Sequence, residues 1–465
     1  MSNNLKVTVN GTTVSVTSGT LLSDILDIEK PCGGHGSCGK CKVRVNGQDE
    51  LACKYVITSD IEVETYQKTE IISETGSNES GVVTDNMCLA LDIGTTTLAL
   101  ALVSCDDKKI VKAITATNPQ RNFGADVISR IDYCQKNGVS QLNKAIIDAV
   151  NSMIEKLLGE YRLHKIEKMF VSGNTTMLHC FFGVDCSSMG VSPYTPAFLG
   201  SKEKSAAELG IKSVDSIFSL PGISAFVGAD IVAGVGYVGL PSSDSFCLLV
   251  DLGTNAEIAL FDKKRLLCTS AAAGPCFEGV NISCGMSATD GAVYEYLADK
   301  SFKSFGNCPP KGICATGLID IIAESVKNET IDESGYMEDD LVICDGVTLT
   351  PKDVREFQLA KSAVLSAIEC LLKRANIYFD NIERLYVAGG FSSALKIENA
   401  VFVGLLPKGS EKKFTPINNS SLLGTVKFSC QDSNLSFVEN SEFIDISSTS
   451  DFSERFFENM YFEVE

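Results

Sequence analysis

A duplicated pattern constrains the fold of this chain more than any other feature of its sequence. Residues 88–102 have the pattern of a buried strand, then Asp-x-Gly-Thr, then a second apolar strand, and residues 247–260 repeat that order. An internal repeat reports architecture directly, and the interval between these copies is far too long for a solenoid. The two copies therefore predict two similar α/β lobes, each built on a strand, a turn and a returning strand.

The residues of the two turns suit a nucleotide with Mg²⁺. An aspartate at a strand end can hold a hydrated Mg²⁺, because this ion keeps several waters and uses few carboxylates. Glycine and threonine can offer backbone N–H and hydroxyl groups to phosphate oxygens. One such turn alone is weak evidence, because Asp and Gly are common turn residues. Two copies at matching positions of the repeat favour a nucleotide site. The predicted residues are Asp92, Gly94, Thr95 and Thr96 in the first copy and Asp251, Gly253, Thr254 and Asn255 in the second.

A third element follows the second copy. Residues 382–392 have the pattern of a buried strand that runs into Gly389-Gly390 and then a helix. A turn of this kind lets a base or ribose approach the backbone closely. Two Asp-x-Gly-Thr turns followed by Ala-Gly-Gly resemble the phosphate-one, phosphate-two and adenosine motifs of the actin-like (ribonuclease H-like) ATPases. The resemblance implies ATP and Mg²⁺ as ligands. Further predicted elements are helices over 131–158, 362–374 and 419–425, a strand and turn over 168–177, and a glycine-rich turn into a helix over 226–235.

Four cysteines near the N-terminus predict an iron–sulfur centre. Cys32, Cys38 and Cys41 have the spacing C-x5-C-x2-C, and Cys53 follows after eleven more residues. This spacing is close to that of plant-type 2Fe–2S ferredoxins, and the intervening glycines allow a tightly bent loop. A structural zinc site and inert buried cysteines are the alternatives. Zinc is less favoured because it usually takes two C-x-x-C-like pairs.

The segments around these cysteines predict a small sheet. Residues 6–9 and 13–16 form a hairpin about Asn10-Gly11, and strands 41–45 and 51–57 flank Asn46-Gly47. A short helix is expected over 21–26. This order resembles the β-grasp ferredoxin fold. The predicted domains are a ferredoxin-like domain (1–66), a flexible linker (67–86), ATPase lobe 1 (87–243), and ATPase lobe 2 with a C-terminal return to lobe 1 (244–465).

Composition narrows the class of protein. The chain has 465 residues, enough for about two to four domains, and its formal net charge of −19 argues against a nucleic-acid binder. No apolar run is long enough for a membrane span. The first residues lack the hydrophobic region of a signal peptide, so a cytoplasmic location is expected, with the 18 cysteines mainly reduced. The acid-rich last 35 residues are expected to form a solvated or partner-facing tail.

The combination of a ferredoxin-like domain with an actin-like ATPase resembles the reductive activators of corrinoid enzymes. Residues 118–130 and 273–286 also resemble that family. The resemblance implies ATP-dependent reduction of a corrinoid protein from Co(II) to Co(I) through a 2Fe–2S cluster. It implies as partners the corrinoid protein of a methyltransferase system and a low-potential donor such as a ferredoxin or flavodoxin, with a homodimer left open. Asp92 and Asp251 would position Mg²⁺ and the attacking water.

Several alternatives stay open at this point. The chain could instead activate a radical enzyme of the 2-hydroxyacyl-CoA dehydratase type, hold nucleotide without turnover as a redox sensor, or be a kinase fused to a ferredoxin. The segment 277–286 could face the corrinoid or the nucleotide, or be a packing loop. Arg121 and Asp126 could contact nucleotide or pair with each other. His35 is expected to be a solvent-facing turn residue.

Overall fold

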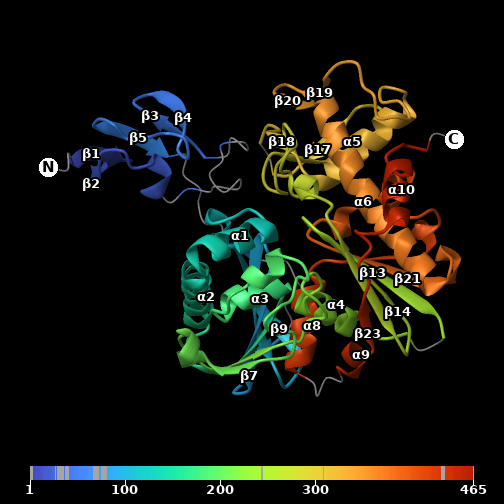
Figure 1. Ribbon diagram of the computed structural model, residues 1–465, viewed down its shortest axis with the longest axis horizontal. Helices are drawn as coiled ribbons and strands as arrows, with labels where there is room; N and C mark the ends of the chain where they lie inside the picture. The colour runs from blue at the N-terminus through green and yellow to red at the C-terminus, as the bar shows by residue number, and fades with distance from the viewer. Residues whose placement is uncertain are drawn as a thin grey trace. The chain divides into compact units, whose positions relative to one another are not determined.

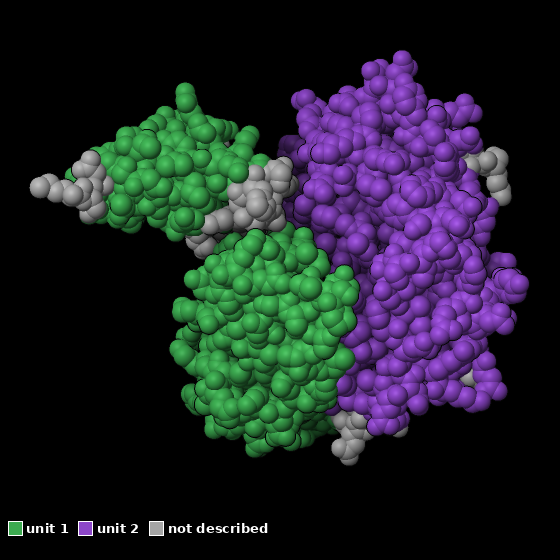
Figure 2. All heavy atoms as spheres, in the orientation of Figure 1, with its two compact units in different colours: residues 1–220, 429–431 green, residues 221–428, 432–465 purple. Residues whose placement is uncertain are grey.

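The computed structural model describes residues 4–26, 28, 36, 41–65, 73–74, 81–241, 244–306, 308–430 and 435–463 (Figure 1). The chain divides into two compact units, residues 1–220 with 429–431 and residues 221–428 with 432–465 (Figure 2). The short segment 429–431 therefore belongs to the first unit, although the chain on both sides of it belongs to the second. Across the described residues, no helix combines the length and the apolar character that a membrane span requires.

The N-terminal part of the first unit is a mixed sheet in the order β2-β1-β5-β3-β4. Both predicted Asn-Gly hairpins are confirmed, and all four turn residues have the positive φ that a type I′ turn requires. The buried core includes Val7, Val43 and Val63. The strands are β1 (Asn4–Val9), β2 (Thr12–Thr17), β3 (Lys42–Val45), β4 (Gln48–Leu51) and β5 (Ile61–Thr65).

Two predicted elements of this sheet are wrong. The strand expected over 51–57 ends at Leu51, and β5 takes the place beside β1 and β3. The helix expected over 21–26 is a single 3-10 turn, Leu22–Asp24. The same contacts account for both differences. The N–H groups of Leu22 and Ser23 donate to the carbonyl oxygens of Tyr55 and Ala52, respectively. These bonds join the two segments as packed loops instead.

The predicted linker, 67–86, lies largely outside the described residues. Within it, β6 (Ser73–Glu74) pairs antiparallel with β9 (Lys109–Thr117). The main sheet of the first unit has the order β11-β12-β10-β7-β8-β9-β6. Its other strands are β7 (Met87–Ile93), β8 (Thr97–Ser104), β10 (Ile166–Gly173), β11 (Glu203–Ser205) and β12 (Val214–Ser219).

The helical pattern over 131–158 proves to be two helices. The chain breaks at Gly138, which has a φ of 76° and follows the end of α1. Positive φ is a conformation that glycine adopts without steric cost. The helices of the first unit are α1 (Val127–Asn137), α2 (Ser140–Glu160) and α3 (Thr175–Phe181).

The main sheet of the second unit has the order β22-β21-β13-β14-β15-β23. Its strands are β13 (Phe246–Leu252), β14 (Ala256–Phe261), β15 (Leu266–Ala271), β21 (Ile382–Ala388), β22 (Phe414–Ile417) and β23 (Ser441–Phe443). Smaller sheets contain β16 (Ala292–Tyr296), β17 (Phe302–Ser304), β18 (Gly312–Ile313), β19 (Leu341–Cys344) and β20 (Val347–Leu349). The α-helices are α4 (Ala229–Val238), α5 (Ala315–Lys327), α6 (Pro351–Ala375), α7 (Ile397–Phe402), α8 (Ser420–Ser429), α9 (Ser436–Glu439) and α10 (Ser450–Glu458).

The acid-rich C-terminal segment is packed, which corrects the expectation of a solvated tail. The strand β23 pairs with β15, and α10 packs along α6 (Figure 1). Ile446, Met460 and Phe462 are each no more than 5% exposed. Apolar residues spaced between the acids therefore outweigh the charge pattern in deciding where this segment lies.

Lys361 of α6 anchors the end of this segment. The side chain is buried, and its Nζ donates to the carbonyl oxygens of Asn459 (2.6 Å) and Tyr461 (2.8 Å). Burial lowers the pKa of Lys361 to about 7. Lys361→Met should leave two carbonyls without their donor, at a cost of about 1–3 kcal/mol each. A free-energy change of about 1.4 kcal/mol alters an equilibrium constant tenfold. Hydrogen exchange of the α10 amides should therefore become faster by tenfold or more.

Lys352→Met is the matched control for this prediction. Lys352 is on the same helix and is exposed. Its substitution should leave exchange in α10 unchanged. Equal exchange rates in the two variants would show that Lys361 does not hold the C-terminal segment.

Candidate functional site

The first Asp-x-Gly-Thr turn connects β7 to β8 in the first unit. The Gly94 N–H donates to the carbonyl oxygen of Thr97 (3.0 Å), and a Cβ at Gly94 would lie 2.6 Å from that oxygen. Only glycine therefore fits the turn as it is built. Asp92 is buried near the end of β7, opposite Ser172 of β10. The turn thus lies at the same edge of the sheet as the start of α3, as expected for parallel strands.

Three polar side chains that the sequence did not single out hold this turn. Asn118 Nδ2 donates to the Gly94 carbonyl oxygen (2.8 Å), and Arg130 Nη2 donates to the Thr95 carbonyl oxygen (2.5 Å). Asn174, which caps α3, donates from Nδ2 to Thr95 Oγ1 (3.0 Å). Asn118 and Arg130 are fully buried. Groups that hold a loop rigidly keep its N–H and hydroxyl groups in place for a ligand.

The second Asp-x-Gly-Thr turn connects β13 to β14 in the second unit. The Gly253 N–H donates to the carbonyl oxygen of Asn255 (3.0 Å). The Thr254 hydroxyl donates to the carboxylate of Glu278, which belongs to the 3-10 turn Pro275–Glu278. This turn is one residue shorter than the first, since Gly94 bonds three residues ahead and Gly253 two. A carboxylate from a distant segment also orients its threonine.

Glu257 adds a half-buried carboxyl group that the sequence analysis missed. It is located on β14 opposite Asp251 in the strand register. Burial, together with the negative charges of Asp230 and Asp251, raises the pKa of Glu257 well above its usual range. The alternation of apolar and polar residues along the strand gave no reason to select Glu257. Its raised pKa depends in part on Asp230, in the first turn of α4, which is distant in the sequence. The second turn thus has a carboxyl group of raised pKa beside its aspartate.

The predicted adenosine turn follows β21. Because β13 and β21 are parallel and pair Asp251 with Ala388, the turn emerges beside the second Asp-x-Gly-Thr turn. Gly389 has a φ of 116°, and a Cβ on it would lie 2.6 Å from the Leu252 carbonyl oxygen. The helix expected directly after this turn is a short 3-10 turn, Ser392–Ala394, and α7 begins later.

A pair of alanine substitutions tests the adenosine turn. Gly389→Ala should weaken ATP binding by about tenfold or more, because strain of about 1–3 kcal/mol forces the turn away from Leu252. Gly159→Ala, on α2 and outside the proposed site, should leave the affinity unchanged, since no atom lies within 4 Å of a Cβ built there. Titration calorimetry with ATP measures both. Equal affinities for the two variants would remove Gly389 from the proposed site.

The segment 277–286 is a packed loop that reaches both turns of the second unit. Phe277 is 5% exposed, and its ring lies 5.7 Å from the ring of Phe391, next to the adenosine turn. Ser283 donates from its N–H (2.7 Å) and hydroxyl (3.0 Å) to Asp353 Oδ1. This packing favours the structural alternative for Phe277. The neighbouring Glu278, bound to Thr254, is the residue that touches a predicted phosphate turn.

Asp126 has a structural role. It caps α1 by accepting a hydrogen bond from the Ser129 N–H (2.7 Å), which accounts for this residue without a nucleotide. His179 is fully buried, and its Nδ1 lies 2.7 Å from the Thr175 carbonyl oxygen. His35 is outside the described residues.

Two of the four predicted cluster cysteines lie within the described part of the chain, and they meet. Cys41 immediately precedes β3, and Cys53 follows β4 by two residues. The tight Asn46-Gly47 turn brings the two ends of the hairpin together, so both thiols are buried with Sγ atoms 3.1 Å apart. Thiolates this close can share one metal ion. Cys32 and Cys38 fall outside the described residues.

The chain is similar to known proteins over most of its length. Residues 87–243 match the family described as the RACo middle region, and residues 245–465 match the C-terminal domain of RACo, the ASKHA domain. The chain is 29% identical over 362 residues to the corrinoid activation enzyme RamQ of Eubacterium limosum. That alignment covers 69% of this chain and 60% of RamQ, so the chain spans less than two thirds of that relative.

Two further comparisons agree. The chain is 26% identical over 379 residues to the Co(II) methylated amine-specific corrinoid protein reductase of Methanosarcina barkeri, covering 72% of this chain and 68% of that protein. The fold is similar to the solved structure of a reductive activator for corrinoid, iron-sulfur protein, with a TM-score of 0.74, 26% identity and 98% coverage of both chains. With both RACo regions present in order, the chain belongs to the RACo family, and it carries that family's actin-like ASKHA domain.

Proposed function

We propose that this chain uses ATP to reduce a corrinoid protein from Co(II) to Co(I). The observation that carries the proposal is that one chain joins a close pair of buried thiols to both RACo regions. The relatives named above support it, since they are described as a corrinoid activation enzyme, a Co(II) corrinoid protein reductase and a reductive activator for corrinoid, iron-sulfur protein. A low-potential donor, such as a ferredoxin or flavodoxin of the cytoplasm, would supply the electron.

The cysteines are proposed to hold a 2Fe–2S cluster. The close, buried pair of Cys41 and Cys53 suits thiolate ligation, and Cys32 and Cys38 complete the ligand set. The mixed sheet order β2-β1-β5-β3-β4 supports a β-grasp ferredoxin-like domain over residues 1–66. When bound, the cluster would supply a one-electron carrier. The chain's contribution is to bury two of the ligands at the ends of one rigid hairpin.

The two lobes are proposed to bind Mg-ATP through their repeated turns. Asp92 and Asp251 would position Mg²⁺ and the attacking water. Phosphate oxygens would be held by backbone and hydroxyl groups of Gly94, Thr95, Thr96, Gly253, Thr254 and Asn255. Gly389 and Gly390 would flank the adenosine. ATP can favour one conformation of the chain only through a difference in its affinity for the two conformations.

The proposal is tested by mixing the chain under anoxia with a low-potential reductant, Mg-ATP and a Co(II) corrinoid protein from the host. Co(I) absorbance should rise with ATP and stay at baseline with ADP. An ATP-independent rise, or none with any of the host's corrinoid proteins, would overturn the proposal. The alternative of a nucleotide-binding sensor predicts no turnover, so phosphate release measured in the same mixture separates the two.

A further inference from the structure

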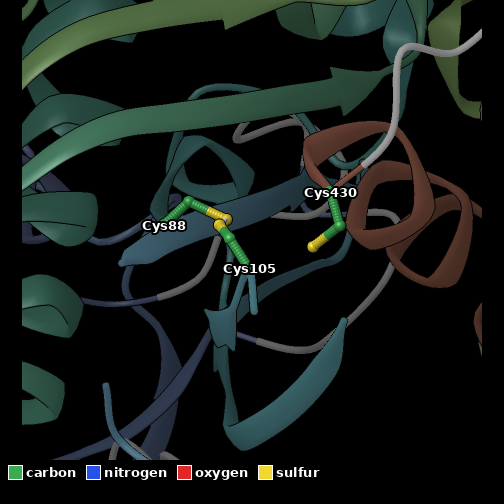
Figure 3. Close-up of side chains that lie close together, drawn as sticks. All are labelled: Cys88, Cys105 and Cys430. Atoms are coloured by element: carbon green, nitrogen blue, oxygen red, sulfur yellow. Dashed lines mark hydrogen bonds between the residues drawn. The ribbon is translucent and has the colours of Figure 1, made fainter. Parts of the chain in front are cut away.

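Three other thiols meet in the first unit, away from the predicted cluster loop. The Sγ atoms of Cys88, Cys105 and Cys430 all lie within 4.8 Å of one another, as they do for no other group of three potential ligands among the described residues. Cys105 Sγ lies 3.1 Å from Cys88 Sγ. Figure 3 shows the three side chains, from β7, from the turn after β8 and from the segment after α8.

The strand register explains why two of these thiols share a face. Cys88 of β7 is opposite Val103 of β8, and Cys105 lies two residues beyond Val103. Side chains two residues apart on a strand point to the same face, so Cys88 and Cys105 are diagonal neighbours. The Cys105 N–H donates to the carbonyl oxygen of Asn86 (3.0 Å), which extends the pairing beyond the end of β8.

The third thiol comes from a distant part of the sequence. The helix α8 ends at Ser429, whose Oγ accepts a hydrogen bond from Cys88 Sγ (3.3 Å) and lies 3.4 Å from Cys430 Sγ. Residues 429–431 form the segment that belongs to the first unit while the flanking chain belongs to the second. Cys430 therefore meets the β7–β8 hairpin where the chain returns to the first unit.

The three thiols change one another's pKa values. Hydrogen bonds from Cys105 and Cys88, with a contribution from the charge of Lys108, lower the pKa of Cys430 to about 3. The same contacts, together with burial, raise the pKa of Cys88. The hydrogen bond with Cys430, together with burial, raises the pKa of Cys105 to about 11. A metal ion that binds here takes thiolate ligands and so displaces the thiol protons.

We propose that Cys88, Cys105 and Cys430 together bind one thiophilic divalent metal ion, for which Zn²⁺ is the probe. Tetrahedral Zn²⁺ with Zn–S bonds of about 2.3 Å places its sulfurs about 3.8 Å apart. The observed separations, from 3.1 Å to at most 4.8 Å, bracket that value. A disulfide would use two of the three sulfurs, whereas a metal ion uses all of them. The proposal does not rest on the function proposed above.

The bound ion would fasten the return segment to the strand pair that carries the first Asp-x-Gly-Thr turn. Cys88 and Cys105 are located on either side of that hairpin's open end, and Cys430 is the attachment point of the returning chain. Removing the ion should therefore loosen Ser429 and Cys430 without unfolding β7 and β8, which are buried along almost their whole length.

The test measures zinc per chain in the full-length protein, kept under anoxia with its iron retained and dialysed against a weak chelator. Wild type should hold one Zn²⁺ more than Cys430→Ser and one more than Cys105→Ser. Either substitution should weaken binding at least 100-fold, because even outer partners of a metal site change affinity by about 10–100-fold. Cys308→Ser, a partly exposed thiol outside the group, is the matched control and should keep the ion.

A second readout needs no variant. Zinc should protect Cys105 and Cys430 of the wild-type chain from alkylation, as read by peptide mass spectrometry, while Cys308 stays equally reactive. Equal zinc content in wild type and Cys430→Ser, or alkylation that is unchanged by zinc, would overturn the proposal. A disulfide between any two of the three cysteines in the anoxic protein would also overturn it.

Discussion

Asp251→Asn should lower the rate of ATP hydrolysis by about 10²–10⁴-fold, the range in which a positioned acid–base group contributes. The substitution keeps the side-chain volume but removes the charge that is proposed to position Mg²⁺ and water. It also removes one of the two negative charges that raise the pKa of Glu257. Phosphate release at saturating Mg-ATP measures the effect, and visible absorbance should show the iron–sulfur centre unchanged.

Asp244→Asn is the matched control for this substitution. Asp244 is an exposed aspartate in the same unit, with its carboxylate 3.7 Å from Lys263 Nζ. Surface ion pairs of this kind contribute little to the stability of the fold. ATP hydrolysis by this variant should therefore remain at the wild-type rate. If Asp251→Asn hydrolysed ATP as fast as Asp244→Asn, the second Asp-x-Gly-Thr turn would have no part in catalysis.

Cys53→Ser should abolish ATP-dependent Co(I) formation while ATP hydrolysis stays within about twofold of wild type. A serine hydroxyl is a poor replacement for a thiolate ligand of iron, and Cys41 would lose the sulfur that lies 3.1 Å away. Iron and sulfide analysis should show loss of the cluster. The expected result is an intact ATPase with no path for the electron.

The control for that result is Cys308→Ser, which changes a cysteine outside both thiol groups. It should keep the iron content, the ATPase rate and Co(I) formation of the wild type. Full Co(I) formation by Cys53→Ser would exclude this cysteine as a required ligand. Loss of ATP hydrolysis in Cys53→Ser would instead point to a folding defect, which hydrogen exchange of β7 would detect.

The sequence was sufficient wherever local chemistry decides the structure. Asn10-Gly11 and Asn46-Gly47 form the predicted hairpins because their positive φ values need those residues. The repeated strand–turn–strand units appear at Asp92 and Asp251, and in the first of them glycine is the residue that fits the tight turn. The turn at Gly389 follows a buried strand, as expected.

Features that depend on distant contacts could not be predicted. Asn118, Arg130 and Asn174 hold the first turn only because α1, α3 and the loop after β9 pack around it. Glu278 gains its role from Thr254, and Cys88 and Cys105 gain theirs from Cys430, far along the chain. The packed C-terminal segment likewise depends on α6 and β15, which no charge pattern reveals.

The most direct test of the central claim is a single-turnover measurement without external reductant. The chain is reduced, freed of reductant and mixed under anoxia with a Co(II) corrinoid protein, and Mg-ATP is then added. The account predicts that Co(I) appears only after ATP, in an amount equal to the electrons lost from the reduced chain. Co(I) formed equally well before ATP, or oxidation of the chain without Co(I), would contradict it.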